Sequence, residues 1–303
     1  MKRVAKWIGW ILGGIVGLLL VMVVGVYLVS SQKLNKTYAV EPTAVTIPND
    51  ATAVAEGQRQ FFTHGCIDCH DTNGAGKIVI DDALMGHVSG ANLTPGTGGI
   101  GQTFTDIDWA RAIRHGIGAD GKPLVIMPSQ DYNKMNDEDL GYLIAYLKTL
   151  PPVDLTSSPI SLGPVGRLLI AGNIFPVLSA ETIAHDAPRP VTVAKGPTVE
   201  YGRYLASQTC MACHGEGLSG GPIPGVPSEP PYAMNLTPDK ETGLGNWDQA
   251  DFAQLLRQGQ RPDGTAVDPT KMPWPAFQYY TDDELTALWV FLQSIPAQPY
   301  GNR

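Results

Sequence analysis

Cysteine is scarce in this chain. Only four cysteines occur among 303 residues, and all lie in residues 66–70 and 210–214, each with the pattern C-x-x-C-H. A zinc ribbon is disfavoured because a short loop usually separates its cysteine pairs, whereas 141 positions separate Cys69 from Cys210. A thioredoxin-like dithiol is disfavoured because neither flank alternates between strand and helix. Neither alternative explains a histidine directly after each second cysteine.

Positive charge is also scarce. The chain has 21 Lys and Arg against 29 Asp and Glu, a net charge of −8. Without Lys2, Arg3 and Lys6 near the N-terminus, 18 basic residues remain against 29 acidic ones, a net charge of −11. This balance excludes nucleic acid as a partner and permits a protein partner with a basic face. The sequence also lacks a phosphate loop, a nucleophile–base pair and a further metal cluster, so no bond-making site is indicated.

C-x-x-C-H is the attachment pattern of a c-type haem. The two thiols add across the vinyl groups, and the histidine lies under the iron as the proximal ligand. We therefore expect two covalently bound haem c groups. Their predicted attachment residues are Cys66, Cys69 and His70 for the first, and Cys210, Cys213 and His214 for the second.

Residues 7–29 carry no charge, and this run of 23 residues is long enough to cross a bilayer as a helix. The cations before it place the N-terminus in the cytoplasm. A cleaved leader is the alternative, but its apolar core is normally about 7–15 residues, and residues 29–32 (V-S-S-Q) form a poor cleavage site. We expect a single-pass protein of the bacterial cytoplasmic membrane with its haem domains on the periplasmic side, where haem c is attached.

The chain after residue 50 is an internal duplication. The matching segments are E-G-Q-R at 56–59 with E-Y-G-R at 200–203, N-L-T-P at 92–95 and 235–238, R-H-G at 114–116 with R-Q-G at 257–259, D-G at 120–121 and 263–264, and M-P at 127–128 and 272–273.

The two M-P segments predict the second axial ligands. Met127 follows His70 by 57 positions, and Met272 follows His214 by 58. A thioether is a soft ligand suited to low-spin haem iron, and His/Met ligation raises the reduction potential. We expect Met127 and Met272 to bind the two irons, each in a loop restrained by the proline that follows.

Other candidate ligands are less consistent with the duplication. Met135 is the rival for the first haem, but it aligns with a tyrosine in the second repeat, and we expect it to pack in the core. His64 and His115 align with glutamines, so we expect each to be a surface or loop residue. The histidines that could replace a methionine are His64, His87, His115 and His185.

Helical patterns recur in both repeats, and no strand pattern is evident. Helices are expected over residues 54–62 and 199–206, near 105–115 and 248–258, and after the N-caps Asn136 and Thr281. Thr281 and Glu284 form a capping box. The predicted class is all-α. The expected domains are an anchor (1–32), a tether (33–50), a first haem domain (51–152), a connector (153–196) whose apolar stretch packs against or between the haem units, and a second haem domain (197–303).

Together these features resemble class I cytochromes c, in particular the dihaem and trihaem cytochrome subunits of membrane-bound bacterial dehydrogenases. The resemblance covers about residues 52–150 and 197–296 and rests on C-x-x-C-H, N-L-T-P, the glycine-rich segments 98–101 and 242–245, the D-G turn, M-P and the final helix. It implies two tandem class I cytochrome c domains. The chain departs from the three-haem subunits in having two haem sites and an N-terminal anchor, which leaves the partner open.

The resemblance also implies positions for four polar side chains. Asn92 and Asn235 would lie near the haem edges, and Arg59 or Arg203 could face the propionates. The alternative is that the asparagines cap turns and the arginines are solvated.

The predicted function is that of a membrane-anchored electron carrier, not an enzyme. It accepts single electrons from a periplasmic dehydrogenase or quinol-oxidising complex and passes them towards a terminal oxidase or a soluble cytochrome. One alternative is a dihaem peroxidase, in which Met127 does not bind and His87 or Glu56 serves the open iron. Another is a cytochrome subunit built permanently into an oxidase or respiratory supercomplex.

Overall fold

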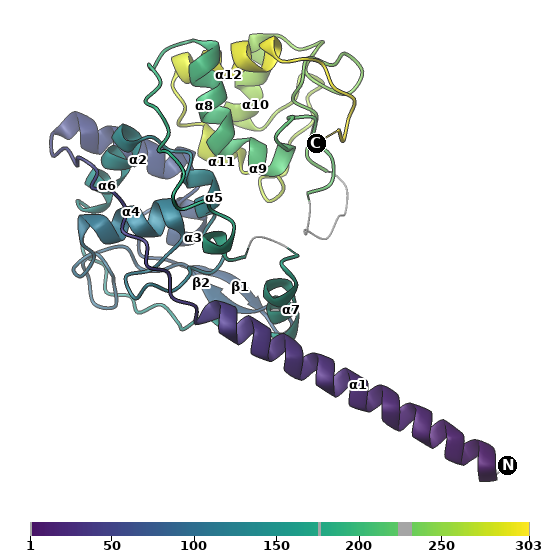
Figure 1. Cartoon of the computed structure of the whole chain (residues 1–303). Helices are drawn as coiled ribbons and strands as arrows, with labels where there is room; N and C mark the ends of the chain where they lie inside the picture. The colour runs from purple at the N-terminus through teal and green to yellow at the C-terminus, as the bar shows by residue number, and fades with distance from the viewer. Residues whose placement is uncertain (1, 175–176, 224–231, 303) are drawn as a thin grey trace.

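The computed structural model describes residues 2–174, 177–223 and 232–302. Two helical units lie against each other, and one long helix projects from the first (Figure 1). The helices of the anchor and first unit are α1 (Lys2–Leu34), α2 (Ala51–Thr63), α3 (Ile67–His70), α4 (Asp106–His115), α5 (Ser129–Tyr132) and α6 (Asp137–Leu147). The connector contains α7 (Pro164–Gly172) and the 3-10 helix η1 (Ser179–Glu181). The second unit contains α8 (Val199–Thr209), α9 (Met211–His214), α10 (Gln249–Gln258), α11 (Trp274–Phe277) and α12 (Asp282–Ser294).

The helix ends follow the capping signals in the sequence. Asn136 accepts a hydrogen bond from Asp139 N at the start of α6, and Thr281 forms the expected capping box with Glu284 at the start of α12. Each of these long helices packs against the helix that precedes its C-x-x-C-H motif: α6 against α2, and α12 against α8. Both units therefore have the same helical framework, and two tandem domains of one helical class are confirmed.

The helix pairs cross at equivalent glycines, one in each unit. A β-carbon on Gly57 would overlap the carbonyl oxygen of Tyr142, and a β-carbon on Gly202 would overlap that of Ala287. The core of the second unit surrounds its crossing, with Phe291 and Leu292 at most 1% exposed. Close approach of the two backbones thus depends on the absence of a side chain at these positions.

A small antiparallel sheet was not expected from the sequence. Its strands are β1 (Ile78–Asp82), β2 (Gly86–Ser89) and β3 (Ser161–Leu162), in the order β1-β2-β3. β1 shows no alternation of burial, since four of its five residues are exposed. β3 supplies only two residues, from more than 70 positions along the chain. The expectation that no strand occurs was therefore wrong. β1 and β2 form a local hairpin without an alternating hydrophobic pattern, and β3 joins it from a distant segment.

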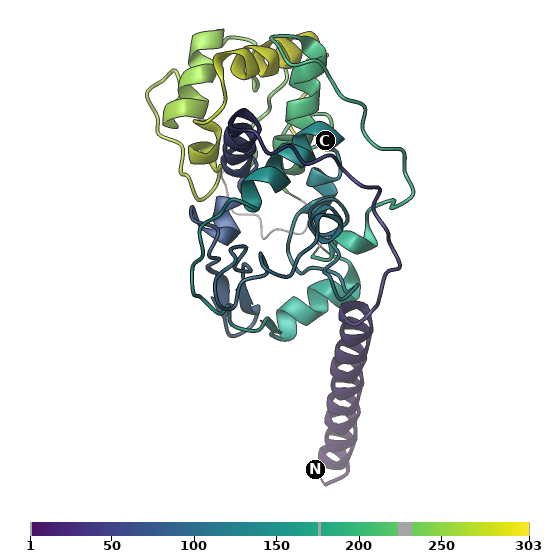
Figure 2. The ribbon, with the colours of Figure 1, turned by 90° about the vertical axis from the view of Figure 1, so that its left-hand side faces the viewer.

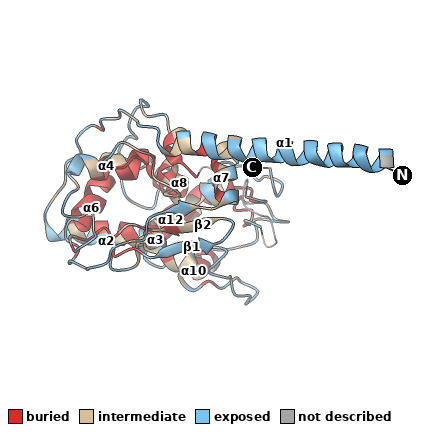
Figure 3. Cartoon of the chain, turned by 90° about the horizontal axis from the view of Figure 1, so that it is seen from below, coloured by how far each residue is buried: buried red, intermediate tan, exposed pale blue. Residues whose placement is uncertain are grey.

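Helix α1 leaves the first unit as a continuous rod (Figure 2). Residues 3–34 contain an 18-residue stretch with a mean hydropathy of 2.7, and the helix is long and apolar enough to cross a membrane, a property that N-terminal signal sequences share. Figure 3 shows that α1 is exposed except near its junction with the first unit. There the guanidinium of Arg167 lies 3.1 Å from Ser30 Oγ and 3.0 Å from Ser31 Oγ, and Lys33 pairs with Glu181 at 3.0 Å.

The segment between α1 and α2 is not a free tether. Tyr38 N donates to Gly121 O, and Val40 O accepts a hydrogen bond from Arg111. Val45 and Ile47 pack on the core of the first unit. Residues 36–49 therefore run along the first unit without helix or strand structure of their own.

The apolar stretch of the connector packs against the first haem unit, since Ile170 belongs to a buried cluster that includes Val125 and Ile126. Ile170 is 2% exposed and packs with Leu34 at the end of α1, whereas Leu168 and Ile174 are 46% and 50% exposed. Phe175, which belongs to the same stretch, lies outside the described residues.

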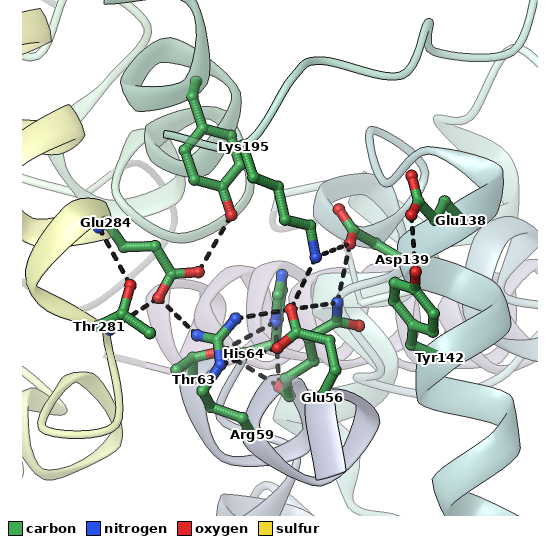
Figure 4. A network of polar contacts seen from close by, with 12 residues as sticks. Glu56, Arg59, Thr63, His64, Glu138, Asp139, Tyr142, Lys195, Thr281 and Glu284 are labelled. Atoms are coloured by element: carbon green, nitrogen blue, oxygen red, sulfur yellow. Dashed lines mark hydrogen bonds and ion pairs between the residues drawn. The ribbon is translucent and has the colours of Figure 1, made fainter. Parts of the chain in front are cut away.

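A network of charged and polar side chains joins the two units (Figure 4). Arg59 binds Glu56 in its own unit at 2.7 Å and Glu284 in the second unit at 2.5 Å. Lys195 binds Glu56 at 2.8 Å and Asp139 at 3.2 Å. Tyr204 of the second unit donates to Asp139 at 2.6 Å. The units are therefore held in one arrangement by apolar contact and by paired charges, among which the carboxylates of Asp139 and Glu284 are buried.

This network predicts a specific acid sensitivity. Burial raises the pKa of Glu56, but hydrogen bonds and charge attraction from Arg59 and Lys195 outweigh it and lower the pKa to about 2. Because the ordinary value is 4.5, Glu56 stabilises the folded state above that pH and loses this effect as the pH falls towards 2. We expect a loss of about 3 kcal/mol from this group, measured by denaturant unfolding across that range. If Glu56→Gln leaves the acid dependence unchanged, the prediction is wrong.

Candidate functional site

The first C-x-x-C-H motif opens onto a cavity of about 480 Å³. Cys66, Cys69 and His70 line it on one side, and Met127 lines it from the loop before α5. The rest of the lining is largely apolar. In the first unit it comes from α2, α4, α6, the hairpin of β1 and β2 and the loop over residues 90–105, and the second unit adds further residues. The lining residues of the first unit include Phe61, Val79, Val88, Leu93, Ile100, Phe104, Trp109, Ile113, Leu143 and Leu147.

The second motif opens onto a cavity of about 400 Å³ with the same arrangement. Cys210, Cys213 and His214 line it together with Met272. Met234, 20 positions after His214, also lines this cavity, and its backbone carbonyl lies 2.7 Å from His214 Nδ1. The residues that the sequence predicted for each haem therefore line a common cavity. This holds although the histidine and the methionine are 57 positions apart in the first unit and 58 in the second. Met135 is fully buried in the core of the first unit and lines neither cavity, as the sequence predicted.

Backbone carbonyls orient both histidine rings. His70 Nδ1 lies 2.8 Å from Ala91 O, and His214 Nδ1 lies 2.7 Å from Met234 O. Because a carbonyl only accepts, Nδ1 carries the proton in each ring and the lone pair is on Nε2. Burial lowers the pKa of His70 and so favours the neutral ring. The hydrogen bond to Ala91 O offsets part of this lowering. Each ring is thus in the tautomer that can bind a metal through Nε2.

The N-L-T-P segments hold these carbonyls in place. Asn92 Oδ1 accepts from Thr94 N and Oγ1, while its Nδ2 donates to Val153 O and Leu155 O. Asn235 repeats the pattern in the second unit, with Gln298 O as an acceptor. The asparagines therefore cap the turns directly after Ala91 and Met234. This is the second of the two roles considered from the sequence, turn capping rather than a place at the haem edge. The carbonyls that orient the histidines belong to the residues directly before the two N-L-T-P segments. The repeated segment was thus the sequence signal for them, although this role was not assigned to it from the sequence.

The two arginines do not face the cavities. Arg59 is paired with Glu56 and Glu284, and Arg203 lies over the Phe291 ring at 4.9 Å from its centroid. Neither residue lines either cavity, so their expected position at the propionates was wrong.

The cysteine thiols have environments unlike those of a redox dithiol. Burial raises the pKa of Cys66 to about 12 and that of Cys210 to about 11. Reactive dithiols and zinc-bound cysteines need thiolates, which a low pKa favours. Among the described residues, no group of three or more His, Cys, Asp and Glu side chains is placed to hold a metal ion. The geometry thus fits neither a dithiol nor a zinc cluster.

The other histidines are more buried than the sequence suggested. His115 is 6% exposed and lies in α4, with Nδ1 3.1 Å from that of His185. His64 caps the end of α2, and its ring nitrogens lie 3.0 Å from Gln60 O and 3.1 Å from Gln208 Oε1. The prediction of a surface or loop residue was wrong for His115, whereas His64 does lie in the turn that follows α2. Of these histidines only His64 lines the first cavity, and both its nitrogens already have partners.

The two cavities share a wall that the sequence did not reveal. Thr209, Pro273 and Phe277 line both of them. Ala212, which lies inside the second C-x-x-C-H motif, also lines the first cavity. The two cavities therefore share part of their lining. No sequence signal could have located this wall, because packing between the units creates it.

Both cavities fit a large planar cofactor. Their volumes fall within the range of roughly 300–1,000 Å³ typical of cofactor pockets. Each combines two thiols, a correctly oriented imidazole and a thioether in one largely apolar lining. This donor set suits haem, attached through the thiols and bound at the iron by the imidazole and the thioether.

The chain belongs to the cytochrome c family: the family model for cytochrome c matches residues 54–151 and again residues 199–296. Covalently attached haem c follows from this membership. Among its relatives, the fructose dehydrogenase cytochrome subunit of Gluconobacter japonicus is 30% identical over 283 residues, covering 84% of this chain and 55% of that protein.

Two further relatives extend the comparison. The gluconate 2-dehydrogenase cytochrome c subunit of Pantoea cypripedii is 30% identical, covering 82% of this chain and 61% of that protein. A protein named diheme cytochrome c-type from Cereibacter sphaeroides is 28% identical, covering 80% of this chain and 86% of that protein. The chain thus spans little more than half the length of the dehydrogenase subunits, and most of the dihaem protein.

Proposed function

We propose that this protein is a membrane-anchored dihaem c-type cytochrome that carries single electrons. One haem c is attached at Cys66 and Cys69 and the other at Cys210 and Cys213. The predicted axial ligand pairs are His70 with Met127 and His214 with Met272. The observation that carries the proposal is that each cavity brings together one C-x-x-C-H motif and the methionine of the distant M-P segment, Met127 in the first and Met272 in the second.

The haem groups supply the one-electron chemistry, and the chain's own residues set the conditions for it. The apolar linings exclude water, which together with the thioether ligand favours a high reduction potential. The carbonyls of Ala91 and Met234 fix the histidine rings, so the ligand geometry needs little change between oxidation states. The shared wall of Thr209, Pro273 and Phe277 supports electron transfer between the two sites within one molecule.

The names of the relatives support a dehydrogenase as the electron donor. Electrons would then pass to a terminal oxidase or a soluble cytochrome. Helix α1 supports attachment to the cytoplasmic membrane, and its N-terminal cations support placement of both haem units on the periplasmic side. The alternative of a permanent subunit of a larger complex is tested by co-purification from mild detergent, which would retain the partner in fixed stoichiometry.

A dihaem peroxidase receives no support from the described geometry. Glu56 is held by Arg59 and Lys195 between the units, and His87 lies on β2 beside Asp81 at 3.3 Å. Neither of these candidate acid–base residues lines the first cavity.

The direct test is a redox titration of the haem-loaded full chain, with and without carbon monoxide. We expect two low-spin haems, a methionine–ferric charge-transfer band for both, and no carbon monoxide binding. A haem that is high-spin or binds carbon monoxide would contradict the proposed ligands.

Methionine replacement assigns the ligands one by one. Met127→Ala and Met272→Ala should each open one sixth position, so each variant is expected to bind one carbon monoxide and the double variant two. The affected haem should also lose reduction potential, since the thioether raises it. Met135→Ala is the matched control and should bind none, although it destabilises the core. If Met135→Ala binds carbon monoxide and Met127→Ala does not, the assignment for the first haem is wrong.

A further inference from the structure

The loop that carries Met127 contains an unusual backbone conformation. Ile126, directly before Met127, has a φ of +69°. This left-handed region is rarely adopted by β-branched residues, because their side chains crowd the backbone there. Such a conformation persists only where the surrounding structure imposes it.

Connector residues impose this conformation from outside the haem unit. Ile126 N donates to Val177 O at 2.7 Å, and Ser179 Oγ donates to Met127 O at 2.5 Å. Two consecutive residues of the loop, Ile126 and Met127, are thus held by two residues of the connector. Val177 and Leu178 are 7% and 3% exposed, so these contacts are shielded from water.

The equivalent loop of the second unit is self-contained. Lys271 N and Met272 N both donate to Asp268 O, at 3.0 and 3.1 Å. Thr270 closes the same turn by donating its backbone N and its Oγ1 to the Asp268 carboxylate. Lys271, which occupies the position equivalent to Ile126, does not have a positive φ. The two methionine loops therefore differ in what holds them.

The connector itself rests on the end of α1. Val177, Leu178 and Ile170 form a buried cluster that also includes Leu34, from the last turn of α1, and Ile126 from the methionine loop. Glu181 of η1 pairs with Lys33 at 3.0 Å. A continuous set of contacts thus leads from α1 through the connector to the residue before Met127.

We propose that residues 177–179 are positioning residues for the sixth ligand of the first haem, and that docking of the connector on α1 keeps Met127 in place. The inference rests on the proposed ligand role of Met127. When the connector undocks, Ile126 relaxes from its left-handed conformation and Met127 moves away from the cavity. The first site then gains an exchangeable position while the second keeps its ligand.

The test uses the full chain, loaded with haem and kept in detergent, with carbon monoxide as the probe. Ser179→Ala removes the hydrogen bond to Met127 O together with the contact between Ser179 Oγ and Gln130 Oε1. We expect about a tenfold increase in the fraction of molecules with Met127 dissociated, which corresponds to about 1.4 kcal/mol. The readouts are the rate of carbon monoxide association with the reduced protein and the loss of charge-transfer absorbance in the oxidised protein. Thr182→Ala, which removes a hydroxyl bonded only to Ser179 O within the same segment, is the control and should change neither.

A rescue variant separates positioning from general destabilisation. Glycine adopts positive φ readily, so Ile126→Gly in the Ser179→Ala background removes the need for external support. We expect the double variant to return towards the wild-type rate. Met127→Ala combined with Ser179→Ala should bind no more carbon monoxide than Met127→Ala alone, because both act on one haem.

Each outcome has a distinct meaning. Equal behaviour of Ser179→Ala and Thr182→Ala would overturn the positioning role, as would equal effects on both haems or a failed rescue. A Met127→Ala variant that stays low-spin and inert to carbon monoxide would instead overturn the ligand assignment on which the inference rests.

Discussion

Arg59→Met is expected to lower the free energy of unfolding by about 3–5 kcal/mol, the usual cost of removing one partner from a buried ion pair. Arg59 is the only side chain in the described network that binds both Glu56 and Glu284. Glu284 is 3% exposed, so its carboxylate would lose a cation without gaining water. Chemical denaturation of the full chain, followed by helical circular dichroism, measures the change.

Two further variants control this experiment. Lys148→Met removes an exposed pair with Asp106, whose side chains are 48% and 52% exposed, and should cost less than about 1 kcal/mol. Glu284→Gln in the Arg59→Met background removes the stranded charge and should restore part of the loss. An Arg59→Met chain no less stable than Lys148→Met would show that the network contributes little to the fold.

Gly202→Ala should lower the free energy of unfolding of the second unit more than a substitution at an exposed position does. The new methyl group would overlap the carbonyl oxygen of Ala287 in the facing helix, and a backbone atom cannot move aside as a flexible side chain can. Overpacking of a core costs about 1–3 kcal/mol even where side chains can adjust, so we expect at least about 3 kcal/mol here.

The consequence for haem attachment provides the measurement. Helix α8 ends directly before Cys210, so separation of α8 from α12 would displace the second C-x-x-C-H motif. We expect purified Gly202→Ala to carry a reduced haem content and a lower denaturation midpoint. Glu200→Ala, at an exposed position of α8, should stay within about 0.5 kcal/mol of wild type. Wild-type behaviour of Gly202→Ala would mean that the helices can separate without penalty.

Features governed by local chemistry could be predicted from the sequence. The caps Asn136 and Thr281 mark helix starts through bonds to residues three positions away, and the duplication paired Met127 with Met272 without any structure. The long-range features could not be predicted. The hairpin of β1 and β2 pairs with residues 161–162, which lie more than 70 positions further along the chain. Arg59 binds Glu284, which is 225 positions away. Ser179 looks like any polar residue of a proline-rich connector until the fold places it beside Met127.

The fixed junction at the end of α1 bears on how this protein finds its partners. A haem unit on a flexible linker samples many heights above a bilayer, and its encounters depend on the reach of that linker. Arg167 and Lys33 instead tie the connector to the last turns of α1. With α1 in the membrane, the first haem site stays at a nearly constant height above the bilayer and meets partners by lateral diffusion in two dimensions. A membrane partner must then hold its own redox centre at the same height above the bilayer. A partner whose redox centre lies at another height requires a soluble electron carrier between the two.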